Sequence, residues 1–292
     1  MNNNREKLMM IAAMTIFGTI GIFRRYIPLP SSTLALARGV IGTLFLLTLV
    51  LFVKKQSLNK AAIKRNLLCL VISGALIGFN WILLFEAYQY TTVAVATLCY
   101  YMAPVIVVIV SPFLFKEKLT PLKAACVAVA LIGMVFVSGL PQSGFGGVSE
   151  LKGILLGLGA ALLYAMVVVL NQYIKDIPAY DKTIMQLGMA AVAILPYTLL
   201  TENFADISFT PVAIVMLLFV GIVHTGIAYT LYFGSMSGLK AQTIALFSYI
   251  DPVVAIILSA VILHENIGFW GAIGAEMVLG STLVSELFGE KK

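Results

Sequence analysis

The sequence predicts an all-α integral membrane protein whose ten transmembrane helices form two five-helix inverted repeats. Three observations predict this fold. The composition is far more apolar than that of a soluble domain, ten segments are apolar enough to cross a bilayer, and one stretch of the chain recurs at half its length. Because each copy holds an odd number of helices, the second copy enters the membrane upside down relative to the first.

The composition excludes a soluble domain. Hydrophobic residues make up 61% of the 292 residues and charged residues 11%, whereas soluble domains carry roughly a quarter charged residues. A net charge of +6 does not indicate nucleic acid, because the basic residues lie between apolar segments, where membrane topology signals lie. The cysteines lie inside apolar segments without paired spacing, as buried thiols do. We expect surrounding membrane lipid, no nucleic-acid partner, no metal site and no cofactor.

Ten apolar windows approach the length of about 20 residues that a helix needs to cross the hydrocarbon core. The first follows Arg5 and Lys7 without an obvious small-residue cleavage site, so we interpret it as an uncleaved span. The fifth is short, and the third and fourth nearly touch. In chain order the windows cover residues 8–27, 32–53, 67–88, 91–115, 122–138, 152–173, 183–201, 211–232, 240–262 and 268–287.

Lys and Arg residues set the orientation of the spans. With the N-terminus in the cytoplasm, most of them fall in cytoplasmic segments. Arg24, Arg25 and Lys152 fall in external segments, and Arg38 lies inside the second window. This bias predicts a multi-pass protein of a bacterial-type inner (cytoplasmic) membrane with both the N- and the C-terminus in the cytoplasm.

One stretch of the chain recurs 148 residues later, and the two copies align without gaps. The segment from Leu98 to Glu117 matches the segment from Leu246 to Glu265 at seven positions, including the Pro-Val pair in each. We therefore expect one repeat over residues 1–137, a Gly- and Ser-rich linker over residues 138–150, and a second repeat over residues 151–292. In many secondary transporters the solute site lies between two such copies.

Asp251 is the first candidate for chemistry. An ionisable side chain at membrane depth costs at least ~2.5–3.5 kcal/mol, so each one needs a reason. Asp251 lies about halfway along the ninth window, directly before Pro252, and its counterpart in the first repeat is Ala103. Its carboxylate is predicted to bind a substrate ammonium group or sodium, or to exchange a proton. The alternative is a carboxylate satisfied by Ser248 or Tyr249.

Three further ionisable residues are candidates for gating or coupling. Arg38 and Glu86 fall in the outer third of their windows and are predicted to pair as an external gate. The alternatives are a static buried pair, two side chains that reach water separately, or pairing of Glu86 with Arg24 or Arg25. His224 lies in the middle of the eighth window, where a side chain that titrates near neutral pH can relay a proton. The alternative is a neutral histidine hydrogen-bonded across helices.

Aromatic and amide side chains supply the second part of a predicted solute pocket. Such pockets are mostly apolar and aromatic with a few polar groups, and ring faces attract cations. Plain helix packing is the alternative for each ring. Glu276, in the tenth window, is predicted to make a helix–helix or dimer contact, with solute binding left open. The predicted substrate-binding residues beside Asp251 are Trp81, Tyr100, Tyr101, Tyr249, Asn80 and Asn171.

Two features carry a resemblance to a known family: the two five-helix units, and a span that ends in Pro-Val, an apolar run and then Glu. The chain is similar in both to the EamA-type branch of the drug/metabolite transporter superfamily. That resemblance implies a central cavity lined by spans one, three, four, six, eight and nine, with spans five and ten at the periphery. The motifs read Ala103-Pro104-Val105 to Glu117 and Asp251-Pro252-Val253 to Glu265, with further likeness in Arg38 and in the run Asn80–Tyr88.

These observations favour a secondary transporter over an enzyme. The predicted function is alternating-access export of small zwitterionic or cationic organic metabolites such as amino acids, amines or drug-like cations, with the direction implied by the resemblance. Coupling to protons or to sodium is left open, as are a monomer and a homodimer. His264-Glu265 begins like a zinc-protease motif, but Gly268 stands where the second histidine belongs. The alternative function is a non-transporting membrane sensor or scaffold.

Overall fold

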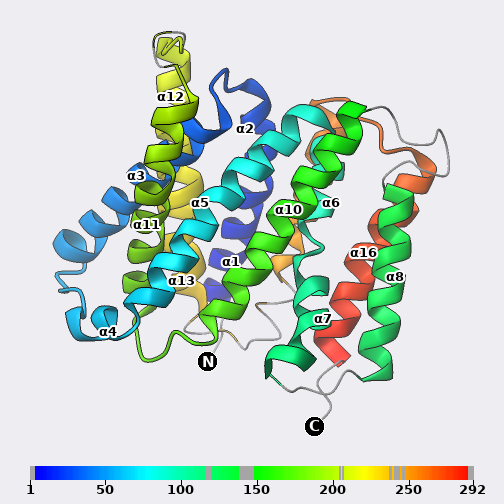
Figure 1. Cartoon of the computed structure of the whole chain (residues 1–292), viewed down its shortest axis with the longest axis horizontal. Helices are drawn as coiled ribbons and strands as arrows, with labels where there is room; N and C mark the ends of the chain where they lie inside the picture. Colours follow the sequence, from blue (N-terminus) through cyan, green and yellow to red (C-terminus); the bar gives the residue numbers. More distant parts are fainter. Residues whose placement is uncertain are drawn as a thin grey trace.

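Helices make up the regular structure of the chain (Figure 1). The computed structural model describes residues 4–115, 120–137, 148–203, 205, 207–236, 239, 244 and 247–288, and no strand occurs within these ranges. The predicted linker residues 138–147 and the repeat positions Glu117 and Leu246 lie outside them. Helix α1 begins and helix α16 ends at the lower edge of the molecule in Figure 1.

The first half of the chain begins with α1 (Asn4–Gly18), which is separated from α2 (Ile20–Tyr26) by Thr19. The second span is α3, which continues as a π-helical stretch, η1. A short helix, α4, then leads into the long helix α5. The bounds of these and the following helices are α3 Ser31–Thr48, η1 Leu49–Val53, α4 Lys60–Arg65, α5 Leu67–Tyr90, α6 Val93–Tyr100, α7 Ala103–Phe115 and α8 Pro121–Val137.

The second half of the chain follows the same outline. A long helix, α10, is followed by a second long helix, α11. The next span is built from α12, the π-helical stretch η2 and α13, and α15 and α16 complete the described chain. Their bounds are α10 Val148–Asn171, α11 Ala179–Thr201, α12 Pro211–Phe219, η2 Val220–Ile227, α13 Ala228–Met236, α15 Ile250–Ile262 and α16 Gly268–Phe288.

Seven helical segments of the described chain are long and apolar enough to cross a membrane. The described parts of two predicted windows, 122–138 and 240–262, contain the shorter apolar helices α8 and α15, and window 268–287 falls on α16. The structure therefore supports a helical membrane bundle, while ten spans in two inverted repeats stay a prediction. The seven segments are Asn4–Tyr26, Ser31–Val53, Leu67–Tyr90, Val93–Leu114, Val148–Asn171, Ala179–Thr201 and Pro211–Ser235.

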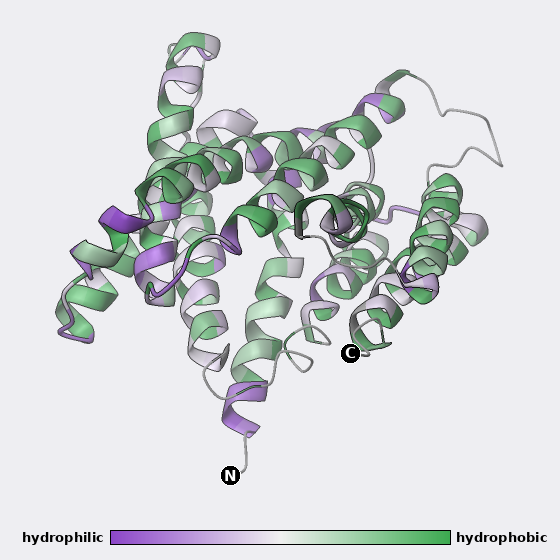
Figure 2. Cartoon of the chain, turned by 60° about the horizontal axis from the view of Figure 1, so that its bottom comes forward, coloured by the Kyte–Doolittle hydropathy of each residue, from purple (hydrophilic) through white to green (hydrophobic). Residues whose placement is uncertain are grey.

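The outer faces of these helices are apolar. Leu68, Phe113 and Leu200 are 73%, 83% and 86% exposed, and side chains of this kind are stable at such exposure when lipid surrounds them. Figure 2 shows hydrophobic residues along the middle of the helices and hydrophilic residues at the first turn of α1. With its several apolar spans, the chain is a multi-pass membrane protein.

Each half of the chain packs its first helix against the other half. Helix α1 packs on α13 and α15, and helix α10 packs on α5, α6 and α7. Helices α3 and α11 also pack against each other and run antiparallel. Ser32, at the start of α3, donates to Glu202 at the end of α11, and the Asn59 backbone N–H, beyond the end of η1, donates to Asp181 at the start of α11. Helices α8 and α16 approach closely where Gly133 faces Gly274.

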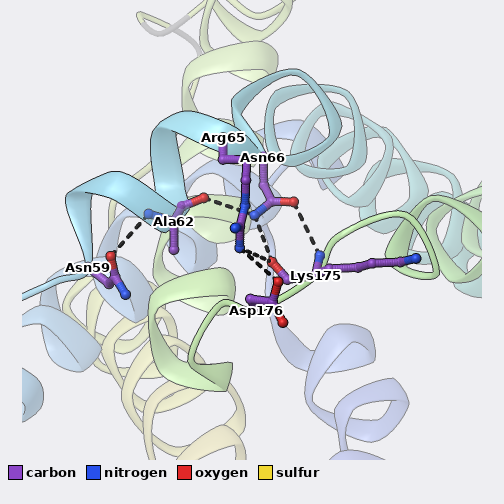
Figure 3. A network of polar contacts seen from close by, with 6 residues as sticks. All are labelled: Asn59, Ala62, Arg65, Asn66, Lys175 and Asp176. Carbon is purple, nitrogen blue, oxygen red and sulfur yellow. Dashed lines mark hydrogen bonds and ion pairs between the residues drawn. The ribbon is translucent and has the colours of Figure 1, made fainter.

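A polar cluster fixes the lower side of the bundle (Figure 3). The Asn66 side chain, at the start of α5, accepts from the Lys175 N–H at 3.2 Å and donates to the Lys175 carbonyl at 3.0 Å. Arg65 pairs with Asp176 at 3.1 Å. These contacts tie α4 to the turn between α10 and α11, so the two halves are joined outside the membrane-spanning segments as well.

Candidate functional site

Three interruptions of regular α-helix lie beside one internal cavity. Thr19 separates α1 from α2, Tyr101 and Met102 separate α6 from α7, and the π-helical stretch Val220–Ile227 separates α12 from α13. Irregular backbone at membrane depth is tolerated where it is buried in protein or lines a cavity, and π-helical turns are frequent at functional sites. The interruptions therefore mark the part of the bundle where a solute site is expected.

The cavity has a volume of about 730 Å³, and its lining is rich in aromatic side chains. That volume is typical of small-molecule sites, which measure about 300–1,000 Å³. The lining residues come from both halves of the chain. They include Lys123 in the first turn of α8 and Gln172 after α10, two segments at the lower edge of Figure 1.

Most of the predicted substrate-binding residues line this cavity, and three of the predicted site residues do not. The structure places Asn171, Glu86 and His224 outside the lining. The predicted residues that do line it are Asp251, Trp81, Tyr100, Tyr101, Tyr249 and Asn80, together with Arg38.

Asp251 lies in the first turn of α15 and accepts a hydrogen bond of 2.9 Å from the Tyr101 hydroxyl. The Ser248 hydroxyl donates instead to the Ile244 carbonyl at 2.9 Å. A side-chain partner of the carboxylate therefore comes from the α6–α7 junction, while the Ser248 hydroxyl is directed elsewhere. A Cβ on Gly18 would lie 2.5 Å from the Asp251 carbonyl oxygen, so α1 and α15 touch at backbone level beside the acid.

The two asparagines hold helices together. The Asn80 side chain borders the cavity, but its amide nitrogen donates to the Ala160 carbonyl at 2.6 Å and so joins α5 to α10. Asn171 accepts from Gln186 at 2.9 Å, and Gln186 also donates to Ser73 at 2.8 Å. The predicted contact of Asn171 with a solute has no support in this arrangement, because the end of α10 turns the amide toward α11.

Arg38 and Glu86 do not form an ion pair in this structure, so their role as an external gate stays a prediction. The Nε of Arg38 donates to the Thr225 hydroxyl at 3.0 Å, and its guanidinium carbon lies 4.3 Å from the centre of the Trp81 ring. Glu86 accepts from the Ser31 hydroxyl at 2.6 Å. Arg38 on α3 therefore points toward Thr225 and Trp81, whereas Glu86 on α5 points toward Ser31. The sequence does not reveal these directions.

Glu86 belongs to a network beside Arg24, one of the competing partners considered from the sequence. Arg24 is buried, and its Nη2 donates to the same Ser31 hydroxyl at 3.0 Å. Its Nε and Nη1 donate to the carbonyls of Phe85 and Ile27 at 3.3 and 3.0 Å. All three nitrogens of this guanidinium group therefore have partners within the protein.

His224 lies in the π-helical stretch η2, outside the cavity. Its Nε2 is 2.8 Å from the Thr19 hydroxyl, at the interruption between α1 and α2. The ring packs edge-on against Phe23 and Phe219, with centroids 4.9 and 5.8 Å away. This environment matches the interpretation of a histidine hydrogen-bonded across helices, and a proton relay stays a hypothesis.

A second network lies at the upper end of the bundle in Figure 1, where α2 ends, α6 begins and α15 leads into α16. Arg25 and Glu265 form an ion pair of 2.7 Å, and Arg25 also donates to the Thr91 carbonyl at 2.7 Å. Glu265 accepts further hydrogen bonds from the Val93 N–H and from the Ser259 hydroxyl. None of these residues belongs to the cavity lining.

Sequence reasoning missed this network and part of the cavity wall. The sequence analysis considered Glu265 as a repeat position and as part of an incomplete zinc-protease motif, although its pairing with a cation was foreseeable from Arg25 in a segment assigned to the same side. Helices α8 and α16 contribute Lys123 and Ser285 to the lining, so they are less peripheral than the family resemblance implied. The lining residues that were not singled out include Tyr88, Thr97, Tyr164, Tyr229 and Tyr232.

The chemistry available in the cavity is that of a binding site. Within the described ranges, no three His, Cys, Asp or Glu side chains lie close enough together to hold a metal ion. The cavity instead offers a half-buried carboxylate, a buried guanidinium group and several tyrosine hydroxyls and rings. Such groups bind charged and aromatic parts of a small organic molecule.

An apolar bundle that crosses the membrane several times around such a cavity has the architecture of a membrane transporter. The sequence profile of the EamA-like transporter family matches residues 5–139 and 151–286. The chain belongs to this family, within the drug/metabolite transporter superfamily.

Individual relatives agree with that placement. The uncharacterized transporter YxxF of Bacillus subtilis is 31% identical over 271 residues, which cover 92% of this chain and 85% of the relative. The aromatic amino acid exporter YddG of Ancylobacter novellus is 26% identical, with 89% and 94% of the two chains covered. A protein crystal structure matches with a TM-score of 0.67 at 21% identity, covering 96% of each chain, and shows likeness of fold alone.

Proposed function

We propose that this protein exports small zwitterionic or cationic organic metabolites by alternating access, with the cavity around Asp251 as the solute site. The observation that carries the proposal is an acid placed in an aromatic cavity and held by the Tyr101 hydroxyl. Carboxylate and ring faces together suit an ammonium-bearing solute such as an amino acid or an amine. Export is supported by the relative that is named an aromatic amino acid exporter.

The proposed cycle uses the upper network as a gate. The lining reaches segments at the lower edge of the bundle, while Arg25 and Glu265 join α2, α6 and the α15–α16 turn at the opposite end. Breaking this ion pair while the lower side closes would expose the cavity to the other side of the membrane. The excess of Lys and Arg in the lower segments supports a cytoplasmic lower side, and thus both termini in the cytoplasm.

The helix packing supports two related halves of opposite direction. The exchange of first helices between the halves is reciprocal, and α3 and α11, which occupy matching places in the two halves, run antiparallel. Both features are expected of inverted repeats that rock against each other around a central site.

The first test is uptake into proteoliposomes that contain the purified protein, with amino acids and amines as radiolabelled solutes. We expect Asp251→Asn to abolish uptake while thermal unfolding and elution in detergent stay unchanged, because the amide keeps the shape and loses the charge. The matched control is Glu276→Gln, an exposed acid on α16, which should transport normally. Full activity of Asp251→Asn would remove Asp251 from the mechanism.

Two other results would revise the proposal. If folded wild-type protein moves no solute under any gradient, a membrane sensor or scaffold replaces the transporter cycle. If a proton or sodium gradient does not change the rate, coupling to that ion is excluded.

A further inference from the structure

Arg38 is a buried cation that has no carboxylate partner among the residues that the structure describes. Its side chain is 6% exposed, and it lies on α3 in the wall of the cavity. The two ion pairs found within the described residues are Arg25–Glu265 and Arg65–Asp176, and neither involves Arg38. A charge at membrane depth is costly unless it is paired. The described part of the bundle therefore places a cation beside the cavity with no carboxylate paired to it.

The unused hydrogen-bond donors of Arg38 distinguish it from Arg24. Arg24 donates from all three of its nitrogens to protein oxygens. Arg38 donates only from Nε, to Thr225, and within the described chain its two Nη groups have no hydrogen-bond acceptor. The two Nη groups of Arg38 are also accessible. Some side-chain nitrogen and oxygen atoms of the described residues are both fully buried and without a hydrogen-bond partner, and the Arg38 Nη atoms are not among them.

The surroundings fix the orientation of this guanidinium group. Its carbon lies 4.3 Å from the centre of the Trp81 ring and 5.5 Å from that of Phe85, while Thr225 holds Nε. A guanidinium group offers a rigid fork of donors that matches the two oxygens of a carboxylate. The side chain is thus already oriented for bidentate binding of an anionic group in the cavity.

We propose that Arg38 binds the carboxylate of the transported solute in the cavity whose lining also includes Asp251. This inference rests on the proposed function and narrows it: the substrate class is zwitterions of the amino-acid type, and organic cations without a carboxylate are poor substrates. A solute carboxylate supplies the missing counter-ion of Arg38. A purely cationic solute leaves Arg38 without one and adds a second positive charge to the cavity.

The test compares amino acids with amines that lack only the carboxylate. The probes are L-phenylalanine, L-leucine and L-lysine, each with its decarboxylated amine: 2-phenylethylamine, 3-methylbutylamine and cadaverine. Uptake into proteoliposomes is measured for the wild type, Arg38→Gln, Arg38→Lys and the control Arg24→Gln. Thermal unfolding of each variant reports folding.

We expect the wild type to take up at least one amino acid about tenfold or more faster than its amine, the factor for losing one charge-assisted hydrogen-bonded contact. Arg38→Gln should lower that ratio to near one by reducing amino-acid uptake alone, and Arg38→Lys should restore part of it. Arg24→Gln should lower stability and affect both members of a pair equally.

Two outcomes would overturn the inference in different ways. Uptake of amines as fast as amino acids by the wild type, or an equal loss of both in Arg38→Gln, shows that Arg38 is structural and leaves the transporter intact. Uptake of no probe by folded wild-type protein overturns the proposed function and this inference together.

Discussion

Arginine and acidic side chains lie both at the upper end of the bundle and in its central cavity, but the two regions differ in the partners that these side chains have. At the upper end, Arg25 and Glu265 pair at 2.7 Å, and Arg24 uses all three nitrogens on protein oxygens. In the cavity, the two Nη groups of Arg38 have no hydrogen-bond acceptor among the described residues, and Asp251 accepts from the Tyr101 hydroxyl. A cation paired with a carboxylate or with carbonyl oxygens holds helices together, whereas a cation beside a cavity without a paired carboxylate can bind an anionic ligand.

Of the three substitutions that test this comparison, the one that breaks the upper network is expected to have the largest effect. Glu265→Gln removes the charge that pairs with Arg25 while keeping the size of the side chain, and a partly buried cation then lacks its partner. We expect the upper end to open and transport to slow about tenfold or more, which corresponds to a loss of about 1.4 kcal/mol or more. The measurement is labelling of Thr97→Cys, in the cavity wall, by an impermeant thiol reagent added to either side of the membrane.

The control for this labelling is the same cysteine with wild-type Glu265. Labelling from the upper side should rise only in the Glu265→Gln background. Equal labelling in both backgrounds would show that the Arg25–Glu265 ion pair does not close the upper end of the cavity. The different pairing of charges at the upper end and in the cavity would then have no role in the transport cycle.

A smaller effect is expected from Tyr101→Phe in the cavity. The change removes the hydroxyl that donates to Asp251 at 2.9 Å and keeps the ring. Because a hydrogen bond contributes about 1 kcal/mol, we expect the half-saturation concentration for the solute to change about threefold to tenfold, with little change in unfolding temperature. A stability loss with unchanged solute affinity would assign Tyr101 to packing.

The smallest effect is expected at the lower side, in the cluster of Figure 3. The side chains of Arg65 and Asp176 are 58% and 80% exposed, and exposed ion pairs contribute under about 1 kcal/mol. Arg65→Ala should therefore leave uptake unchanged and move the unfolding temperature by little. A transport defect as large as that of Glu265→Gln would show that the lower side is a gate held by this pair.

Composition, span length and the repeat predicted the class of fold, because lipid imposes those features on any membrane bundle. The aromatic and acidic residue types at membrane depth predicted a pocket with Trp81, Tyr101 and Asp251, and all three line the cavity. In this structure Arg38 and Glu86 have other partners, and Asn171 lies outside the lining. The sequence does not reveal these positions, because both the lipid-facing and the core-facing sides of a membrane helix are apolar. Periodicity then does not reveal which face points to the cavity. Ring contacts such as that of Arg38 with Trp81 depend on helix rotation, which only the packed structure fixes.

The reciprocal packing of α1 on α13 and α15, and of α10 on α5, α6 and α7, has a consequence for how such a chain arose. The first helix of each half forms part of the cavity wall beside the helices of the other half. If the two halves are the repeats predicted from the sequence, a single half lacks part of this wall, and an ancestor of half the length would have needed two copies to complete the cavity. Joined in one chain, the halves are free to differ, as they do where Asp251 stands opposite Ala103.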